Sequence, residues 1–254
     1  MTPYANELNV ITQAMKKAYL THGHFSTVKE KARFDPVTDA DLNIEVFLKE
    51  AITQAFPRDA ILGEETASTT AIEGRTWTID PIDGTANFAK GIPLFGIQCA
   101  LFEGGVPVVS AIYLPNFDEM YTAIRDQGAF CNGVALKVVP SPVERSVVSF
   151  GDFSHARPDD FTDQHRMQYL ASTHVAKIRM FGSAAVDFCA LAAGGLDGVV
   201  LFTKNQWDLA PGMLLAREAG AVITDPAGEP YTLGSRGVTA TASQELSDRL
   251  KSCF

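Results

Sequence analysis

This 254-residue chain lacks several features that would point away from a globular protein. Its four cysteines are too scattered to form a metal-binding motif, so we expect reduced thiols rather than a disulfide framework. No apolar run approaches the ~20 residues that span a bilayer, and the first residues lack the basic stretch and apolar core of a signal peptide. Basic residues number only 21 against 30 acidic ones, and the net charge of −9 argues against non-specific binding of nucleic acid. These absences predict a cytoplasmic protein whose partners are small molecules, with neither a membrane nor nucleic acid among them.

Hydrophobic residues make up 46% of the chain, enough for a large core in one extended domain or two smaller ones. Apolar residues recur at helical spacing over residues 6–19 and 39–56, so we expect two amphipathic helices, the second capped by Thr38 or Asp39. Strand-like segments then follow one another, and we expect them to form an antiparallel sheet. They cover residues 76–80, 96–102, 106–114, 119–125 and 129–138.

The order of the predicted elements changes after Pro140-Ser141-Pro142. From there on, strand and helix patterns alternate, which is typical of an α/β unit. They lie at residues 147–150, 159–172, 177–181, 183–193, 196–201 and 207–219. We therefore predict an α/β protein with an α+β domain over residues 1–140, which carries most of the acidic motifs, and an α/β domain over residues 141–254, which completes the site.

The most informative segment is WTIDPIDGTAN, at the end of a predicted strand. On an irregular loop the carboxylates of Asp80 and Asp83 and the carbonyl of Ile82 can turn to one point, as the ligands of a hard divalent cation do. Gly84 permits a turn that leaves the amides of Gly84 and Thr85 facing an anion at a predicted helix start. A phosphate that bridges a metal ion and these amides accounts for both halves of the segment.

Two other segments present a carboxylate at the end of an element, namely ILGEE with Glu64 and QWDLAPG with Asp208. A few carboxylates plus substrate phosphate are the usual ligands of Mg²⁺, and gathering them without a cation is opposed by like-charge repulsion. Each residue alone also has a plainer interpretation. Asp80 and Asp83 can be turn formers, Glu64 a solvated strand end, and Asp208 a helix cap.

Five segments, in this order, resemble the magnesium-dependent inositol monophosphatase superfamily: TDADLNIE, GEE, DPIDGTANF, FGSAAV and WDLAPG. The superfamily includes phosphatases of inositol phosphates, fructose 1,6-bisphosphate, histidinol phosphate and phosphoadenosine nucleotides. The resemblance runs from about residue 35 to about residue 220. It implies a layered α/β/α/β/α sandwich of the inositol monophosphatase/fructose-1,6-bisphosphatase type, with the site between the two halves, and a homodimer.

The resemblance also implies a mechanism, in which a metal-activated water hydrolyses a small phosphate ester, similar to inositol monophosphate, without a covalent intermediate. Two or three Mg²⁺ ions per site are implied. Their implied ligands are Glu64, Asp80, the carbonyl of Ile82, Asp83 and Asp208. The implied catalytic residues are Glu64, Thr85 and Asp41, and the implied substrate-binding residues are Asp83, Gly84, Thr85, Gly182, Ser183 and Ala184.

The identity of the ester stays open. Members specialised for inositol phosphate carry an acidic residue seven positions before the aspartate of the WD pair, and Leu201 stands there in this chain. Histidinol phosphate, fructose 1,6-bisphosphate and phosphoadenosine phosphate are therefore alternatives. Lys204, Asn205 and the polar segment 153–166 could contact substrate, a partner or solvent.

Two other classes of protein share features with these motifs. Haloacid-dehalogenase-type phosphatases also use a DGT-like loop, but one residue separates their two aspartates, whereas Pro81 and Ile82 intervene here. A non-catalytic module that binds phosphate or metal is the alternative from outside the enzymes, because a fold alone does not settle function.

Overall fold

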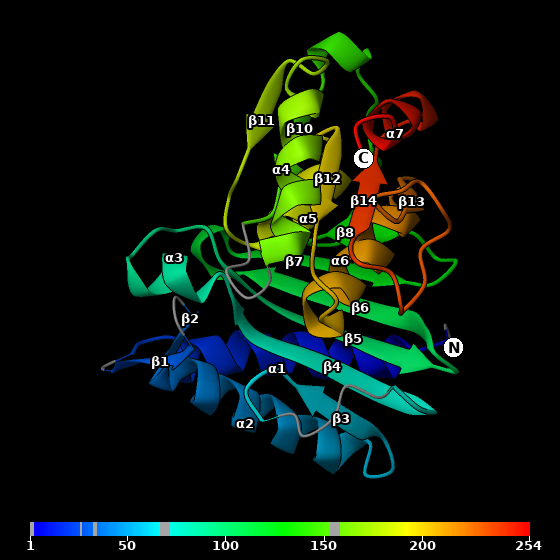
Figure 1. The fold of residues 1–254 in the computed structure, drawn as a ribbon. Helices are drawn as coiled ribbons and strands as arrows, with labels where there is room; N and C mark the ends of the chain where they lie inside the picture. The colour runs from blue at the N-terminus through cyan, green and yellow to red at the C-terminus, as the bar shows by residue number, and fades with distance from the viewer. Residues whose placement is uncertain (1–2, 26, 33–34, 67–71, 153–157) are drawn as a thin grey trace.

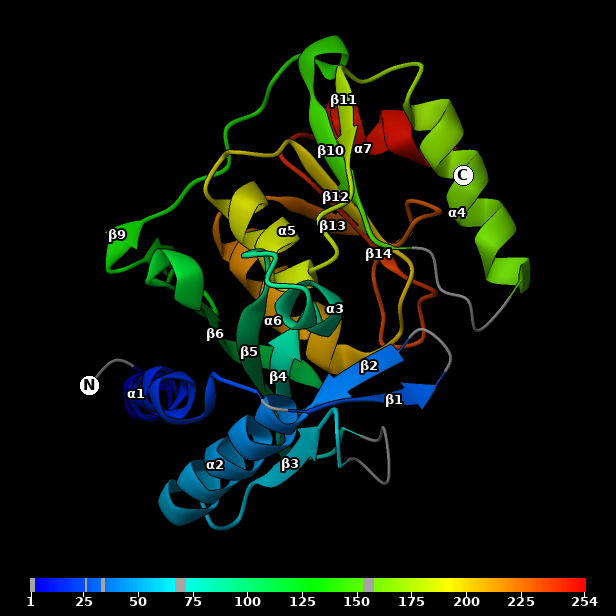
Figure 2. The ribbon, with the colours of Figure 1, turned by 90° about the vertical axis from the view of Figure 1, so that its left-hand side faces the viewer.

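The computed structural model describes residues 3–25, 27–32, 35–66, 72–152 and 158–254. They form five layers in the order helix, sheet, helix, sheet, helix (Figures 1 and 2). The outer helices beside the larger sheet are α1 (Ala5–His22) and α2 (Asp39–Ala55), the central pair is α5 (Ala184–Ala192) and α6 (Gln206–Glu218), and the outer helices beside the smaller sheet are α4 (Pro158–Ala171) and α7 (Gln244–Lys251). The predicted α/β fold with α/β/α/β/α layering is confirmed.

The larger sheet has seven strands in the order β3-β4-β5-β6-β7-β8-β9. From β4 to β9 all neighbours are antiparallel, as predicted, and β3 adds a parallel strand at the edge. The strands are β3 (Ala60–Gly63), β4 (Arg75–Asp83), β5 (Gly96–Glu103), β6 (Val106–Leu114), β7 (Glu119–Ile124), β8 (Ala129–Cys131) and β9 (Val134–Ala135). The short 3₁₀ helix η1 (Pro115–Phe117) joins β6 to β7.

The prediction of one strand over residues 129–138 is wrong. Asn132 and Gly133 both have positive φ, 47° and 80°, and turn the chain into a tight hairpin between β8 and β9. Asn-Gly is a strong hairpin signal, because both residues tolerate the left-handed conformation that such turns require. A second hairpin, β1 (Val28–Ala32) with β2 (Asp35–Thr38), was not predicted.

The smaller sheet has the order β11-β10-β12-β14-β13. Strand β10 is parallel to both neighbours, as expected for alternating strands and helices, while β14 is antiparallel to β12 and β13. The strands are β10 (Val147–Phe150), β11 (Lys177–Arg179), β12 (Gly198–Leu201), β13 (Val222–Thr224) and β14 (Val238–Thr241), and the 3₁₀ helix η2 (Val143–Arg145) precedes β10.

A large apolar core lies between the two sheets. It contains Ile112 and Leu114 of the larger sheet, Val199 and Val238 of the smaller sheet, and the buried faces of α5 and α6 between them. The chain passes from one sheet to the other between β9 and β10, while the division into domains 1–140 and 141–254 stays a prediction.

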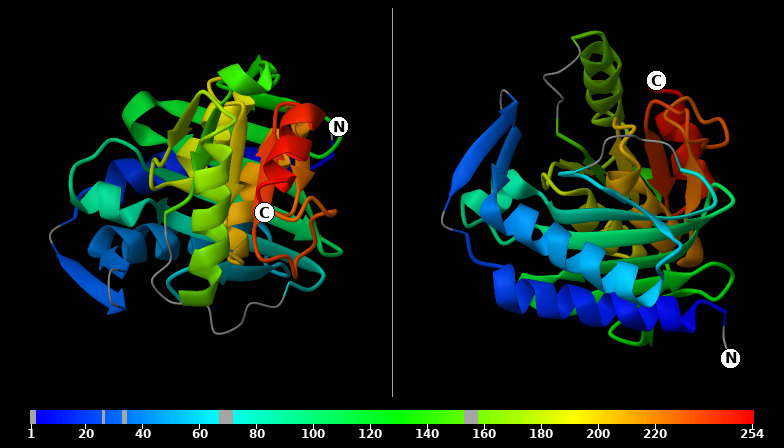
Figure 3. Two further views of the ribbon diagram at one scale, coloured as in Figure 1. Left: turned by 45° about the horizontal axis from the view of Figure 1, so that its top comes forward. Right: turned by 90° about the horizontal axis from the view of Figure 1, so that it is seen from below.

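The outer helices α1 and α2 lie side by side under the larger sheet (Figure 3). Helix α1 buries Ile11, Met15 and Ala18 at the predicted helical spacing. Helix α2 starts with a capping box, because the Thr38 side chain accepts the Asp41 N–H while the Asp41 side chain accepts the Thr38 N–H, so Thr38 is the cap. Among the described residues, no helix is long and apolar enough to cross a membrane.

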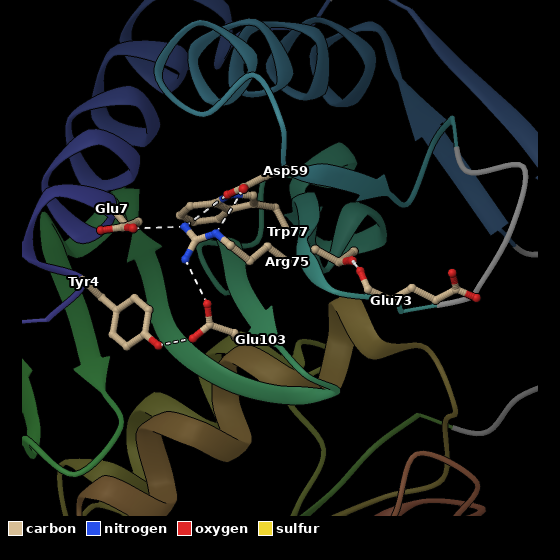
Figure 4. A network of polar contacts seen from close by, with 8 residues as sticks. Tyr4, Glu7, Asp59, Glu73, Arg75, Trp77 and Glu103 are labelled. Atoms are coloured by element: carbon tan, nitrogen blue, oxygen red, sulfur yellow. Dashed lines mark hydrogen bonds and ion pairs between the residues drawn. The ribbon is translucent and has the colours of Figure 1, made fainter.

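An ion-pair network around Arg75 ties α1 to the paired ends of β4 and β5 in the larger sheet (Figure 4). The Arg75 guanidinium contacts Glu7 at 3.0 Å, Asp59 at 3.0 Å and Glu103 at 3.3 Å. The indole N–H of Trp77 donates to the same Asp59 carboxylate at 3.0 Å. Asp59 is nearly buried, with 7% of its side chain exposed, so it depends on these donors.

We expect Arg75→Met to lower the free energy of unfolding by about 1–3 kcal/mol, because it leaves the buried Asp59 carboxylate without its cation. Urea denaturation measures this loss. Arg125→Met is the control: Arg125 is half exposed and lies 3.8 Å from Asp126, so its removal should change stability by less than about 0.5 kcal/mol. Equal effects of the two variants would contradict the importance of the network.

Candidate functional site

A cavity of about 300 Å³ lies between the two halves of the molecule. The predicted acidic residues Glu64, Asp80, Asp83 and Asp208 all line it, and they come from the end of β3, from β4 and from the start of α6. The remaining predicted residues on its wall are Ile82, Gly84, Thr85, Gly182, Ser183 and Ala184. Of the predicted site residues, only Asp41 is set back from this wall.

Asp80 lies inside β4 with 1% of its surface exposed. One carboxylate oxygen accepts the Gln98 side-chain N–H at 3.3 Å, whereas the other is buried without a hydrogen-bond partner. Burial and the nearby carboxylates of Glu64, Asp83 and Asp208 raise the pKa of Asp80 well above its usual range. A buried oxygen of this kind is stabilised by a proton or a cation.

Asp83 ends β4, where the pairing with β5 shifts register between Asp80 and Asp83. This irregularity brings Asp83 to the cavity, where it accepts the Ser183 hydroxyl proton and the Ala185 N–H, the latter at 2.7 Å. Burial raises the pKa of Asp83 to about 6, although the donors from Ser183 and Ala185 oppose the rise. Asp83 therefore joins the end of β4 to the start of α5.

Asp208 occupies the third position of α6, whose N-cap is Asn205. The plainer interpretation of Asp208 as the helix cap is therefore wrong. One of its carboxylate oxygens accepts the Thr203 hydroxyl at 3.1 Å and the Asn205 side-chain N–H at 3.2 Å. Burial and the carboxylates of Glu64 and Asp83 raise the pKa of Asp208 well above its usual range.

Thr85 begins the five-residue helix α3 (Thr85–Ala89), directly after Gly84. Gly84 has φ +89°, so the predicted glycine turn is present. The Thr85 hydroxyl lies 3.1 Å from the Asp41 carboxylate and 2.9 Å from the Ile82 carbonyl. Asp41 is fully buried behind Thr85, and its burial raises its pKa against the opposing donors from Thr38.

The turn before α5 forms the opposite wall. Gly182 has φ +70°, and Ser183 caps α5 by accepting the Val186 N–H at 3.2 Å. The side chain of Asn87 donates to the Phe181 carbonyl at 2.7 Å and so ties α3 to this turn. Two helix starts therefore border the cavity, and helix starts are common anion sites. At α5 the N–H groups of Ala185 and Val186 donate to Asp83 and Ser183.

The donor chemistry of the cavity fits a hard divalent cation, because every candidate ligand is an oxygen. Within the described ranges, however, no three Asp, Glu, His or Cys side chains close around one point tightly enough to hold an ion. Like charges separate, and Asp83 is turned toward Ser183 and Ala185. The carboxylates of this cavity therefore have the right chemistry for the cation. We expect their side chains to turn toward one common point when it binds.

Sequence reasoning missed several residues around the site. Gln98 lies opposite Asp80 in the β4–β5 register, and only knowledge of that register could have found it. Asp187 lines the cavity from α5, is nearly buried and accepts the Ser149 hydroxyl. Asn87 stands inside the motif already singled out, but its partner at Phe181 lies far away in the sequence.

The structure places the residues considered for substrate recognition in different surroundings. Leu201 lines the cavity and is buried. Asn205 supports Asp208, and Lys204 is exposed outside the cavity wall. Within the segment 153–166, residues 153–157 lie outside the described residues.

The stability of the metal-free protein should depend on pH through these carboxylates. The pKa of Asp83 is about 6 when folded and near its ordinary value of 3.8 when unfolded, so between these values the folded protein holds a proton that the unfolded chain has released. Stability therefore falls as the pH rises through this window, and the raised pKa values of Asp80 and Asp208 extend the fall to higher pH.

We expect the melting temperature of chelator-treated protein to fall by several degrees between pH 5 and pH 7.5, with most of the loss reversed by Mg²⁺ at pH 7.5. The Asp83→Asn variant should show a smaller fall. Asp126→Asn serves as the control, because the Asp126 side chain is 89% exposed. A melting temperature that rises over this range would contradict the expectation.

Comparison with known proteins gives matches over almost the entire chain. A family model described as the inositol monophosphatase family matches residues 4–252. A fructose-1,6-bisphosphatase/inositol-1-monophosphatase of Aquifex aeolicus is 35% identical over 205 residues, which cover 80% of this chain and 77% of the relative. A putative Nus factor SuhB of Neisseria meningitidis serogroup A is 33% identical, covering 99% of this chain and 98% of the relative. The crystal structure of the extragenic suppressor protein suhB from Bartonella henselae aligns with a TM-score of 0.88 at 30% identity, covering 98% of each chain.

Proposed function

Since the chain belongs to the inositol monophosphatase family, we propose that it is a Mg²⁺-dependent phosphomonoesterase acting on a small phosphorylated metabolite similar to inositol monophosphate. The observation that carries the proposal is the meeting of four carboxylates, from three separate segments, with two helix starts in one cavity. Carboxylates that hold cations and N–H groups that hold an anion are the two requirements of phosphoryl transfer.

The proposed metal ligands are those that line the cavity. We assign Glu64, Asp80 and the Ile82 carbonyl to a first Mg²⁺, and Asp80, Asp83 and Asp208 to a second. The proposed total is two or three Mg²⁺ ions per site. The partnerless oxygen of the buried Asp80 supports its place in both sets. When bound, Mg²⁺ supplies the positive charge that neutralises the phosphate dianion and activates water for attack on phosphorus.

The protein's own groups bind and orient the reactants. The amides of Gly84, Thr85, Ser183 and Ala184, after the turn at Gly182, are proposed to hold the phosphate oxygens through the helix-start effect. With Glu64, the Thr85 hydroxyl orients the attacking water. Asp41 is placed to accept the Thr85 proton, so that an oxygen lone pair of Thr85 faces the cavity.

No covalent intermediate is needed in this proposal. The Ser183 hydroxyl on the opposite wall donates its proton to Asp83 and accepts the Val186 N–H, which gives it a structural role. The cytoplasmic location, the homodimer and the absence of nucleic-acid partners stay predictions.

A substrate panel tests the proposal. Phosphate release should be measured with and without Mg²⁺ from inositol 1-phosphate, histidinol phosphate, fructose 1,6-bisphosphate, phosphoadenosine phosphate and an aryl phosphate. We expect Mg²⁺-dependent release from at least one natural ester, and the highest kcat/KM identifies the substrate class. Leu201 and Phe202 make part of the cavity wall apolar, which argues against strict specificity for inositol phosphates. Absence of release from every ester, by folded and Mg²⁺-loaded protein, would overturn the proposal.

A second candidate is a non-catalytic binding module, and the Neisseria meningitidis relative is named a putative Nus factor. Its support is the 33% identity over nearly the full length of both chains. The same panel, together with a calorimetric titration of Mg²⁺, separates the candidates, since a binding module binds Mg²⁺ without turnover.

A further inference from the structure

The fully buried carboxylate of Glu45, on α2, lies beside the segment that carries Glu64. One Glu45 oxygen accepts the Glu65 N–H at 2.8 Å, and the other accepts the Thr66 hydroxyl. The Lys49 ammonium, one helical turn along α2, lies 3.0 Å from Glu45 and also donates to Thr66. Three donors from two segments therefore converge on a carboxylate that is 0% exposed.

Gly63 shows how closely the strand end approaches this carboxylate. A Cβ atom at Gly63 would lie 2.4 Å from the Glu45 carboxyl carbon, closer than real Cβ contacts. The next residue, Glu64, donates its N–H to the Ile79 carbonyl at 3.0 Å. The backbone around Glu64 is thus held on one side by strand β4 and on the other by Glu45.

Burying a carboxylate carries a large desolvation penalty. Apolar side chains of similar volume often stabilise a protein as well as a buried ion pair does, or better. Glu45 does not line the cavity, and its oxygens are occupied by Glu65, Thr66 and Lys49. It nevertheless contacts the backbone on both sides of Glu64, through the Glu65 N–H and the close approach of Gly63.

We propose that Glu45 is a positioning residue that fixes the turn at residues 63–66, aims the Glu64 carboxylate into the cavity, and so sets the affinity of the site for Mg²⁺. This inference rests on the proposed function, because it takes Glu64 as a metal ligand. Groups that orient a metal ligand typically change metal affinity by 10- to 100-fold when they are removed.

A double-mutant cycle tests the inference, with Mg²⁺ binding to the whole protein measured by titration calorimetry and circular dichroism as the check of folding. We expect Glu45→Ala to weaken Mg²⁺ binding by about 10- to 100-fold. Glu45→Gln should weaken it less, since the amide oxygen can still accept the Glu65 N–H. In a Glu64→Gln background, Glu45→Ala should cause less than about a threefold further loss, because it acts through Glu64.

The exposed Glu50 on the same helix provides the matched control, and Glu50→Gln should bind Mg²⁺ as the wild type does. If Glu45→Ala does not fold, the same cycle is run with Glu45→Gln and with Gly63→Ala, which drives a methyl group into the carboxylate. Two results would overturn the proposal for Glu45 while leaving the proposed function intact. One is wild-type Mg²⁺ binding by folded Glu45 variants. The other is a loss of Mg²⁺ affinity in the double variant that equals the sum of the two single losses. Wild-type protein that neither binds Mg²⁺ nor releases phosphate would overturn the proposed function together with it.

Discussion

Replacing Asp83 by asparagine is expected to lower Mg²⁺-dependent phosphate release by about a thousandfold, the upper range for removal of one electrostatic group that acts in the transition state. Asparagine keeps the size of the side chain and one oxygen that can accept from Ser183 and Ala185. It removes the negative charge with which Asp83 is proposed to hold Mg²⁺. Initial rates at saturating Mg²⁺ measure the loss.

The same variant has a second expected signature. Because burial raises the pKa of Asp83 to about 6, above its value in the unfolded chain, the charge that Asp83 carries at pH 7.5 destabilises the folded metal-free protein. Asp83→Asn should therefore be at least as stable as the wild type in chelator at pH 7.5 while being nearly inactive. Asp126→Asn, at a highly exposed site, should retain both wild-type activity and stability. An Asp83→Asn variant that keeps more than a tenth of the activity would show that Asp83 is not part of the catalytic site.

The second large effect is expected at Thr85. Thr85→Ala should lower kcat by about 100- to 1,000-fold, a typical contribution of a group that orients or transfers a proton. The hydroxyl lies between the Asp41 carboxylate and the Ile82 carbonyl, so its loss also leaves Asp41 without one of its donors.

Thr85→Ser is the informative control, because it restores the hydroxyl at the same helix start and loses only a methyl group. We expect it to retain activity within about tenfold of the wild type. Equal losses in the alanine and serine variants would point to packing of α3 rather than to the hydroxyl. Stopped assays of phosphate release over a range of ester concentrations separate the change in kcat from the change in KM.

Local features of the site could be predicted from the sequence. Gly84 adopts the left-handed conformation that its place in the motif suggested, and Thr38 caps α2 through a capping box that TDAD displays. Both depend on residues within a few positions of each other, so the sequence contains the whole signal.

Contacts between distant segments could not be predicted in the same way. The bonds from Ser183 to Asp83 and from Asn87 to Phe181 depend on how the turn before α5 lies against the end of β4 and against α3, which no local pattern encodes. The same holds for Gln98, whose place beside Asp80 follows from strand register.

Short elements were the other source of error. Strands β13 and β14 and the hairpin β1–β2 have three to five residues each, too few for a clear period-2 pattern. The single strand predicted over residues 129–138 missed the Asn132-Gly133 turn, since the apolar residues on both sides resembled one continuous strand.

The most direct test of the account is a titration of Mg²⁺ into protein freed of metal by a chelator, with phosphate release from the best ester of the panel as the readout. We predict release at the background rate without Mg²⁺ and a saturable rise on its addition, which Asp83→Asn abolishes. Full release in the presence of chelator, or none at any Mg²⁺ concentration by folded protein, would contradict it.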